Sequence, residues 1–586
     1  MPRITQRLIA VLALVAMIVF VAACGDDDTS SGGQAKDDGA APTEGKKGGK
    51  LEQLGASDVD FMDPGQTYYT GGFQILYATQ KTLYSFKPGE PEAQPDLAAD
   101  APELSDDKKS VTVTLKKGIK FAPPVNREIQ AKDIKYAFER AYTKNVPSQY
   151  TNYWNMIEGV PKAPGDLKDI SGIVIDEADP YKITFNLTTA TAPGFAAFLV
   201  MPVTTPVPKE YAEKFDKESP STYNENVVAS GPYMVRNDAE GKLVGWKPGK
   251  STELVRNPNW DAKQDFRPAY LDEVLLRTNA TDANVSGRQV LAGSHLTLDA
   301  NPPAQVLKRV VTTQKDQLKT VPSGGFRWFP LNSTIKPLDD INVRKAILAG
   351  FDRDAARKAR GGEFVGPVGT HFIPPGILGH EEAGGLEGPE NDFLANPKGD
   401  PALAEKYMKE AGYESGKYDG TDELLMITAN VDPGKAQAEV AKAELEKLGF
   451  KIRLRTVPQA AVYSEWCQQP AKKVAICGSA GWFKDFNDPQ SMLEPTFRGS
   501  AISKEGGNNN MPQLNDPEID KAMDAAALLE GKERFKAWGE IDKMITAQAP
   551  AVPFVWDNTN LIHSKDVNAV PNEYFSAFDF SFTSLK

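Results

Sequence analysis

The chain reads AEVAKAELEKLGFKIRLRT from Ala438 to Thr456, and this stretch decides the fold class. Apolar residues recur every three or four positions up to Leu448, which predicts a helix with one buried face that ends at Gly449. Apolar and polar side chains then alternate from Lys451 onward, which predicts a half-buried strand. A helix that leads directly into a strand is typical of a sheet covered by helices, so the sequence predicts an α/β fold.

Other segments fit the same class. Period-two alternation predicts strands at Val111–Leu115 and Ile183–Leu187. Asp400-Pro401 predicts the start of a helix and Gly412 its end, because an aspartate cap followed by proline favours the first turn and glycine stops the last. A further helix is expected to begin at Asp339 or Asp340.

The N-terminal segment predicts export. Arg3 and Arg7 precede the apolar run Leu8–Ala23, a pattern typical of a signal peptide covering residues 1–23. The last residues of that run, followed by Cys24, resemble the lipobox of bacterial lipoproteins, which implies a lipid on the cysteine. Residues 24–49 are mostly small and polar, so a flexible tether is expected there.

Two alternatives remain open for the same segment. Instead of a lipoprotein signal, it could be a plain transmembrane anchor or a fully cleaved secretory signal. The apolar run is short for a spanning helix, which needs roughly 20 residues.

Composition and charge narrow the function classes. The chain has 586 residues, of which 40% are hydrophobic and 25% charged, and at about 150 residues per domain it holds three or four units. Without residues 1–23, 65 basic residues stand against 79 acidic ones, a net charge of −14. This acidity disfavours a nucleic-acid partner.

The cysteines predict a disulfide. Lipidation of Cys24 leaves Cys467 and Cys477, and an even pair in an oxidising compartment is typical of a disulfide. Two buried free thiols are the alternative. No metal site or cofactor is expected, because none of the four histidines is spaced with the cysteines.

The usual signatures of catalysis are missing from the sequence. It contains no Walker-type phosphate loop, no Gly-x-Ser-x-Gly elbow and no His-Glu-x-x-His zinc helix. We therefore assign no catalytic residue and do not expect an enzyme. An extracytoplasmic hydrolase stays open as an alternative, since two suitably placed carboxylates suffice for a glycosidase.

Short motifs follow one another in a fixed order along the chain. They are Met62-Asp63-Pro64, Pro95-Asp96-Leu97-Ala98, Leu115–Phe121, Ala131–Ile134, Ser230–Tyr233, Leu254–Trp260, Asn342–Ile347 and Glu410–Tyr413. Each is weak alone. In this order the chain resembles the extracytoplasmic solute-binding proteins of bacterial ABC transporters, in the family that binds oligopeptides and dipeptides (family 5).

The resemblance implies a two-lobed periplasmic-binding-protein fold of the class II, cluster C type. It also implies an extra domain inserted near the N-terminus, a hinge of two crossing strands, and a ligand enclosed between the lobes. Mapped onto this chain, lobe one is residues 50–94, 225–322 and 551–586, the extra domain is 95–224, and lobe two is 323–550.

The resemblance also points to ligand-binding residues. In the peptide-binding members, a segment like Gly481–Pro489 supplies an aspartate for the ligand's α-ammonium group and a tryptophan for a side-chain pocket. Those residues here are Asp485 and Trp482. The alternatives are a cap or surface loop for Asp485 and a core position for Trp482. Asp488 fits a turn or cap better than a ligand contact.

A second stretch, Tyr68-Tyr69-Thr70-Gly71-Gly72, resembles the strip of lobe one that lines the cleft. An ordinary loop is the alternative. No residue is singled out for a ligand carboxylate, since Arg327, Lys336 and Arg344 are equally suitable on sequence alone.

The sequence therefore predicts a monomeric, lipid-anchored receptor on the extracytoplasmic face of the cell membrane. It would capture peptides and deliver them to the permease subunits of an ABC importer. A sugar, an amino-acid derivative or a metal chelate is the alternative ligand, with nickel disfavoured by the shortage of histidine.

Overall fold

The fold is known from a computed structural model. It describes residues 45–586 apart from 57, 69, 147, 149, 300, 431, 459, 460 and 504–506, and apart from the side chains of Thr70, Asn152 and Ala304. The predicted signal peptide, Cys24 and most of the predicted tether lie outside these residues. The end of that tether belongs to the body of the protein, because the amide of Gly48 donates to the carbonyl of Tyr270 at 2.8 Å.

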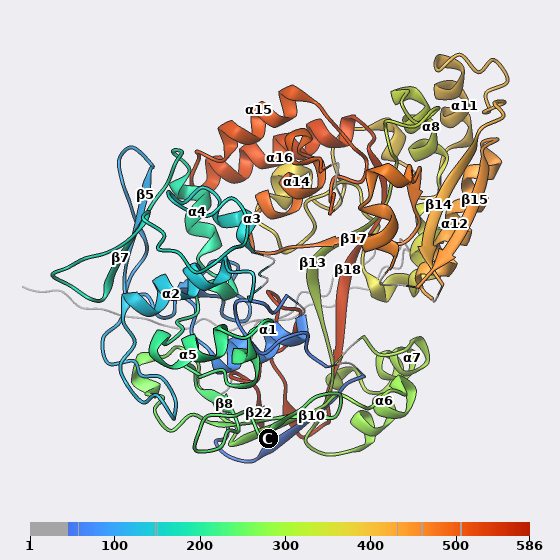
Figure 1. The fold of residues 1–586 in the computed structure, drawn as a ribbon. Coiled ribbons are helices and arrows are strands. Elements are labelled where there is room, and N and C mark those ends of the chain that lie inside the picture. The colour runs from blue at the N-terminus through green and yellow to red at the C-terminus, as the bar shows by residue number, and fades with distance from the viewer. Residues whose placement is uncertain are drawn as a thin grey trace, which may run out of the picture. The chain divides into compact units, whose positions relative to one another are not determined.

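A mixed sheet with strand order β12-β1-β11-β10-β8 forms one half of the body. Its strands are β1 (Lys50–Leu54), β8 (Tyr233–Val235), β10 (Ser251–Arg256), β11 (Glu273–Arg277) and β12 (Leu296–Leu298), with β9 (Trp246–Lys247) beside β10. Helices α1 (Thr70–Thr79), α6 (Ala283–Ala292) and α7 (Ala304–Thr313) lie near this sheet (Figure 1). Ile75 of α1 shares a buried cluster with Leu51 and Val274 of the sheet.

An antiparallel sheet with the order β4-β5-β7-β6 lies beside it. The strands are β4 (Glu103–Leu104), β5 (Ser110–Thr114), β6 (Ile173–Ile175) and β7 (Lys182–Asn186), and the accompanying helices are α2 (Ala131–Ala141), α3 (Thr151–Trp154), α4 (Ala192–Phe198) and α5 (Lys209–Asp216). Val113 pairs with Ile183, so both strands predicted from alternation are confirmed.

A parallel sheet with the order β15-β14-β16 forms the core of the other half. It consists of β14 (Glu423–Ala429), β15 (Lys451–Val457) and β16 (Ile476–Cys477), with α8 (Ile341–Gly350), α9 (Arg353–Arg360), α11 (Pro401–Glu410) and α12 (Gly434–Lys447). Helix α12 leads into β15, as predicted from the sequence. Asp340 and Asp400 cap α8 and α11 through their side chains, which confirms both predicted helix starts.

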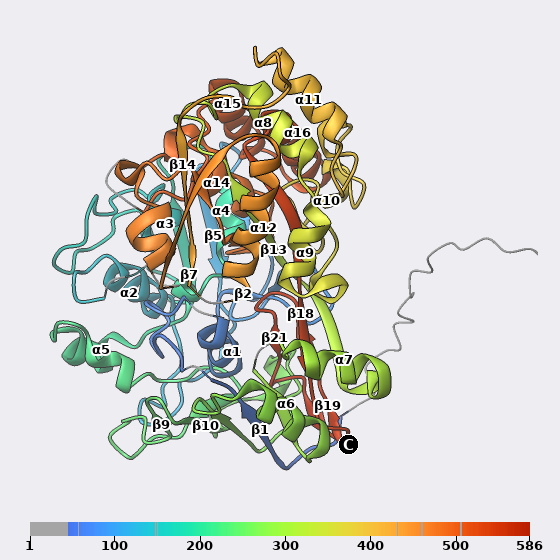
Figure 2. The same cartoon turned by 90° about the vertical axis from the view of Figure 1, so that its right-hand side faces the viewer.

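Two long strands connect the halves. β13 (Leu318–Pro330) and β18 (Ala551–Ile562) pair antiparallel and run side by side in both views (Figures 1 and 2). Leu561 of β18 packs in the core of the mixed sheet, whereas Phe554 packs in the core around β14. β17 (Ala480–Phe483) pairs with β13 and thereby brings the segment after it to the junction.

The remaining elements cover these sheets. They are α10 (His380–Ala383), α14 (Gln490–Phe497), α15 (Pro517–Ala526) and α16 (Gly531–Ala547), and the short strands β2 (Tyr84–Ser85), β3 (Gln94–Pro95), β19 (Val567–Asn568), β20 (Pro571–Asn572), β21 (Ala577–Phe578) and β22 (Ser584–Leu585). The α/β class is confirmed. The predicted segment boundaries stay a prediction.

A buried cluster of charges fixes the end of α1. Lys81 and Arg267 both pair with Asp96 and Asp265, at nitrogen–oxygen distances of 2.7 to 2.9 Å, and all four side chains are at most 3% exposed. Arg267 also donates to the carbonyls of Tyr77 and Gln80 at 3.0 Å. The aspartate of the Pro-Asp-Leu-Ala motif is therefore structural.

We expect Arg267→Met to lower the free energy of unfolding by about 3–5 kcal/mol, because it leaves two buried carboxylates with a single cation. Chemical denaturation measures this change. As a control, Arg236→Met removes the exposed pair with Glu253 and should cost at most about 1 kcal/mol. Equal small losses in both variants would contradict the role given to the buried cluster.

Candidate functional site

A cavity of about 860 Å³ lies where the two halves of the body meet. One wall comes from the mixed-sheet half, chiefly from α1 and from residues near the C-terminus of the protein. The other wall comes from β17 and the residues around it. The lining includes Tyr68, Gly71, Phe73, Gln74, Asp299 and Tyr574 on the first wall and Tyr463, Trp482, Phe483, Lys484 and Asp485 on the second. The cavity is therefore bounded from both halves.

Asp485 lies two residues after the end of β17, and its carboxylate is held by tyrosines from the other half of the body. The hydroxyl of Tyr68 donates to Oδ1 at 2.5 Å, and the hydroxyl of Tyr153 donates to Oδ2. The hydroxyl of Tyr574 donates to the backbone carbonyl of Asp485 at 2.9 Å. No cation forms an ion pair with this buried carboxylate anywhere in the described part of the chain.

The environment of Asp485 acts on its pKa in two directions. Burial raises the pKa of the carboxyl, and the hydrogen bonds from Tyr153 and Tyr68 partly oppose that shift. Burial and the nearby Asp485 raise the pKa of both phenols well above its ordinary value, so the tyrosines stay protonated and donate. An ionised carboxylate has about four acceptor positions, so capacity is left for a cationic donor from a ligand.

Trp482 lies on β17, three residues before Asp485, and takes part in both the core and the cavity. Its indole Nε1 donates to the carbonyl of Ser491 at 2.8 Å, and the half-buried ring packs against the core cluster that contains Trp328. Another part of the residue lines the cavity. The indole is thus fixed in orientation, as a pocket wall requires.

The tyrosine strip is described in part. Tyr68 and Gly71 line the cavity, and a Cβ on Gly71 would meet nothing within 4 Å, so the cavity comes close to the backbone there. Thr70 begins α1, but its side chain is not described. Tyr69 lies outside the described residues.

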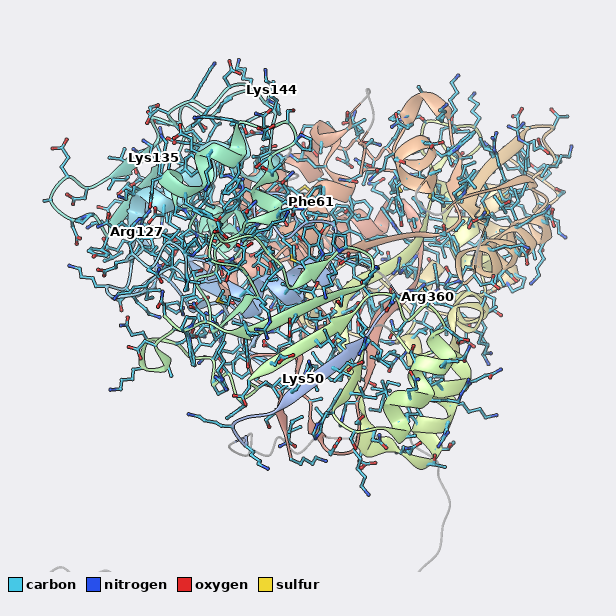
Figure 3. The ribbon with its side chains drawn as sticks, turned by 60° about the horizontal axis from the view of Figure 1, so that its bottom comes forward. Lys50, Phe61, Arg127, Lys135, Lys144 and Arg360 are labelled. Carbon is cyan, nitrogen blue, oxygen red and sulfur yellow. A yellow bond between two sulfur atoms is a disulfide. The ribbon has the colours of Figure 1, made fainter. Side chains whose placement is uncertain are left out.

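The cations considered for a ligand carboxylate have other surroundings. Arg344 donates to the carbonyls of Leu338 and Gln548, and Lys336 is exposed. Arg327 pairs with Asp557, which also binds Arg360 (labelled in Figure 3). None of the three lines the cavity. Asp488, expected as a turn or cap residue, accepts the amide of Gln490 and pairs with Arg534.

The sequence did not predict two cavity residues, Lys484 and Asp299, nor Tyr153, whose hydroxyl donates to Asp485. Lys484 makes no ion pair with any residue that the structure describes, and burial lowers its pKa to about 8 against the opposing charge of Glu573. Its place beside Asp485 could have drawn attention to it. Tyr153 lies 332 residues from Asp485, and no sequence signal links the two.

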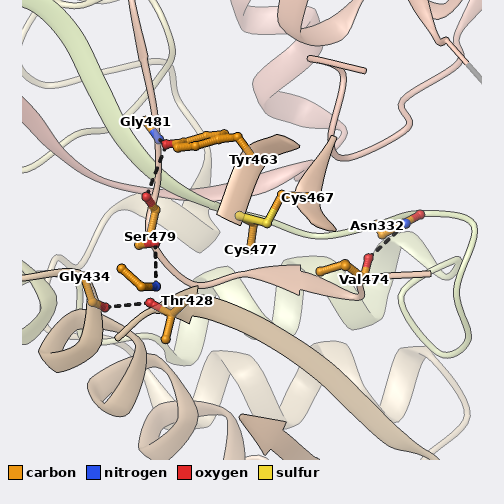
Figure 4. Close-up of a disulfide and its surroundings, with 10 residues drawn as sticks. Asn332, Thr428, Gly434, Tyr463, Cys467, Val474, Cys477, Ser479 and Gly481 are labelled. Carbon is orange, nitrogen blue, oxygen red and sulfur yellow. Dashed lines mark hydrogen bonds between the residues drawn. A yellow bond between two sulfur atoms is a disulfide. The ribbon is translucent and has the colours of Figure 1, made fainter. Parts of the chain in front are cut away.

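A disulfide joins Cys467 to Cys477 with a Cα–Cα distance of 5.9 Å. It links the end of the helical turn Val462–Cys467 to β16 (Figure 4). In that turn, the hydroxyl of Tyr463 accepts from the amide of Gly481 at 3.1 Å. The bridge therefore anchors a turn whose tyrosine lines the cavity and contacts β17.

No helix within the described ranges is long and apolar enough to cross a membrane. Among the same residues, no group of three or more histidine, cysteine, aspartate or glutamate side chains is placed to hold a metal ion.

A family model and the sequences of known binding proteins match this chain over most of its length. The model of the family "Bacterial extracellular solute-binding proteins, family 5 Middle" matches residues 92–504. Heme-binding protein A of Haemophilus influenzae is 27% identical over 570 residues, or 94% of each chain. Oligopeptide-binding protein OppA of Bacillus subtilis is 25% identical over 565 residues, or 94% of this chain and 95% of the relative.

Among solved structures, the clavulanic acid biosynthesis oligopeptide binding protein 2 superposes with a TM-score of 0.81 at 23% identity. The match covers 93% of this chain and 96% of that protein. This likeness shows the fold: the predicted two-lobed architecture is confirmed, while the extra inserted domain stays a prediction.

Replacing both Cys467 and Cys477 by alanine should lower the free energy of unfolding by about 3 kcal/mol, because the cross-link restricts the unfolded chain. The bridged residues are 10 positions apart. Denaturation curves of the double variant and of the wild type under reducing conditions should coincide. A double variant as stable as the oxidised wild type would show that the bridge adds nothing.

Proposed function

The chain belongs to family 5 of the bacterial extracellular solute-binding proteins, and from that premise we propose that it captures peptides for an ABC importer. The observation that carries the proposal is the Asp485 carboxylate. It is buried, it lines the cavity between the halves, and its partners in the described residues are tyrosine hydroxyls rather than a cation. A free peptide supplies the missing cation as its α-ammonium group.

The physics of burial explains why such a carboxylate is needed. An ammonium group loses its hydration when it enters a closed cavity, and this loss prevents binding unless a carboxylate compensates for it. Backbone hydrogen bonds, which are common to all peptide sequences, can supply further affinity. Lys484 gives the cavity a cation for the ligand's carboxylate.

The alternative within the family is a non-peptide ligand. One relative is named for heme and another for oligopeptides. Heme carries two carboxylates, whereas the cavity lining includes the unpaired acids Asp485 and Asp299 against a single unpaired cation, Lys484, among its described residues. Charge complementarity therefore favours a ligand with ammonium groups over a dianionic chelate or an uncharged sugar.

The relatives are binding proteins, and we propose no chemical step for this chain. Mass spectrometry of the native protein separates the candidates. Heterogeneous co-purified peptides support the proposal, one non-peptide molecule supports the alternative ligand, and turnover of an added substrate would indicate a hydrolase.

We also propose a lipid anchor on Cys24 and delivery from the outer face of the cell membrane to a permease. Two or three acyl chains anchor stably where one does not, at roughly 0.8 kcal/mol per buried CH₂. A receptor held near its permease gains local concentration. The proposal treats the protein as a monomer.

Asp485→Asn keeps the side-chain shape but removes the charge, so its affinity for Ala-Ala-Ala should fall about thirtyfold or more. Isothermal calorimetry measures this loss. N-acetylation of the peptide should weaken binding to the wild type by a similar factor. The variant should then no longer distinguish free from acetylated peptide. Unchanged affinity in both tests would exclude the ammonium–aspartate pair.

Cys24→Ala should move the protein from the membrane fraction to the soluble fraction, because the acylated thiol is lost. Its affinity for Ala-Ala-Ala should match that of the wild type, since the cavity is built from residues far along the chain. Persistent membrane attachment would show that another segment holds the protein.

A further inference from the structure

A second carboxylate without an ion-pair partner faces the same cavity. Asp299 directly follows β12, and its amide donates to the carbonyl of Leu54 at the end of β1. Its side chain lines the cavity and makes no hydrogen bond or ion pair with the described residues. The Asp299 side chain is half-buried in the cavity wall, and the resulting desolvation raises the pKa of its carboxyl to about 7. A carboxylate in this environment lacks a cationic partner that a ligand in the cavity can supply.

The backbone around Asp299 holds it in place. Gly55 lies against the carboxylate, since a Cβ at Gly55 would come within 2.7 Å of Oδ2. The amide of Gly55 donates to the carbonyl of Arg277, and the carbonyl of Gly55 accepts from the amide of Ala280. The glycine therefore leaves room for the acid beside a segment whose own polar groups are satisfied.

The other charged residues that line the cavity differ from Asp299, because each of them either has a hydrogen-bond or ion-pair partner or carries a positive charge. Asp58 accepts the backbone amides of Val59 and Gly249. Arg277 pairs with Glu52 outside the cavity. Lys484 is a cation. Within the described lining, this leaves Asp485 and Asp299 as the two acids without a charged or backbone partner.

We propose that Asp299 is a second cation subsite, which selects peptides that carry a lysine or arginine side chain in addition to the α-ammonium group. The inference rests on the proposed function, because the first ammonium group is the one placed at Asp485. The two acids come from opposite walls: Asp485 from the segment after β17, and Asp299 from the mixed sheet.

The charges of such a peptide match those of the cavity. Its α-ammonium group would pair with Asp485, its basic side chain with Asp299, and its carboxylate with Lys484. With a neutral peptide in the cavity Asp299 has no charged partner, and a carboxylate left without one inside an occupied cavity costs free energy that a cation recovers. The preference for a basic residue is therefore expected at one position of the peptide, the one whose side chain reaches Asp299.

The test uses a series of tetra-alanine peptides in which lysine replaces the alanine at each position in turn. The dissociation constant of each lysine peptide is compared with that of the peptide with norleucine at the same position. Norleucine has the same length and lacks the ammonium group, so the ratio of the two dissociation constants isolates the charge. At one position the lysine peptide should bind about tenfold more tightly to the wild type by calorimetry. In Asp299→Asn that advantage should vanish, while the norleucine affinity stays within about twofold.

Asp58→Asn is the matched control, because Asp58 also lines the cavity but has backbone partners. It should keep the lysine advantage. Loss of the advantage in Asp58→Asn, its survival in Asp299→Asn, or its absence at every position would each overturn the subsite. If the alanine and norleucine peptides still bind in an Asp485-dependent way, the proposed function stands without the subsite. If no peptide binds, both fail.

Discussion

The site depends on one constraint: a buried carboxylate that the protein supplies with hydrogen bonds but not with a cation. Asp485 belongs to one half of the body, and the tyrosines that donate to it, Tyr68 and Tyr153, belong to the other. The same carboxylate therefore joins the halves and keeps acceptor capacity for a ligand. A buried charge in this state is costly unless a cation pairs with it, and under the proposed function the ligand's ammonium group would be that cation.

The rest of the structure holds that carboxylate in position. β13 and β18 carry the chain between the halves, and β17 pairs with β13, so the segment after β17, which contains Asp485, is brought to the junction. The disulfide anchors the turn that contains Tyr463, whose hydroxyl accepts from the amide of Gly481 within β17. Phe486, next to Asp485, stacks edge-on against Tyr153 and Phe198 of the opposite half.

The sequence was informative where local rules operate. Caps at Asp340 and Asp400, the helix before Gly449 and the alternating strands could all be predicted, because each depends on neighbours within a few residues. Family motifs pointed to Asp485, yet motif residues such as Asp96 serve the buried charge cluster instead. Tyr153 and Asp299 could not be found, since their roles arise when segments hundreds of residues apart converge, and neither has a local pattern.

The central claim is the pairing of the ligand's α-ammonium group with Asp485. A crystal structure of the wild-type protein with bound tetra-alanine tests it most directly. The account predicts the peptide nitrogen about 3 Å from a carboxylate oxygen of Asp485, with Tyr68 and Tyr153 still donating to the same group. A peptide bound with its ammonium group elsewhere, leaving Asp485 to the tyrosines alone, would contradict the account.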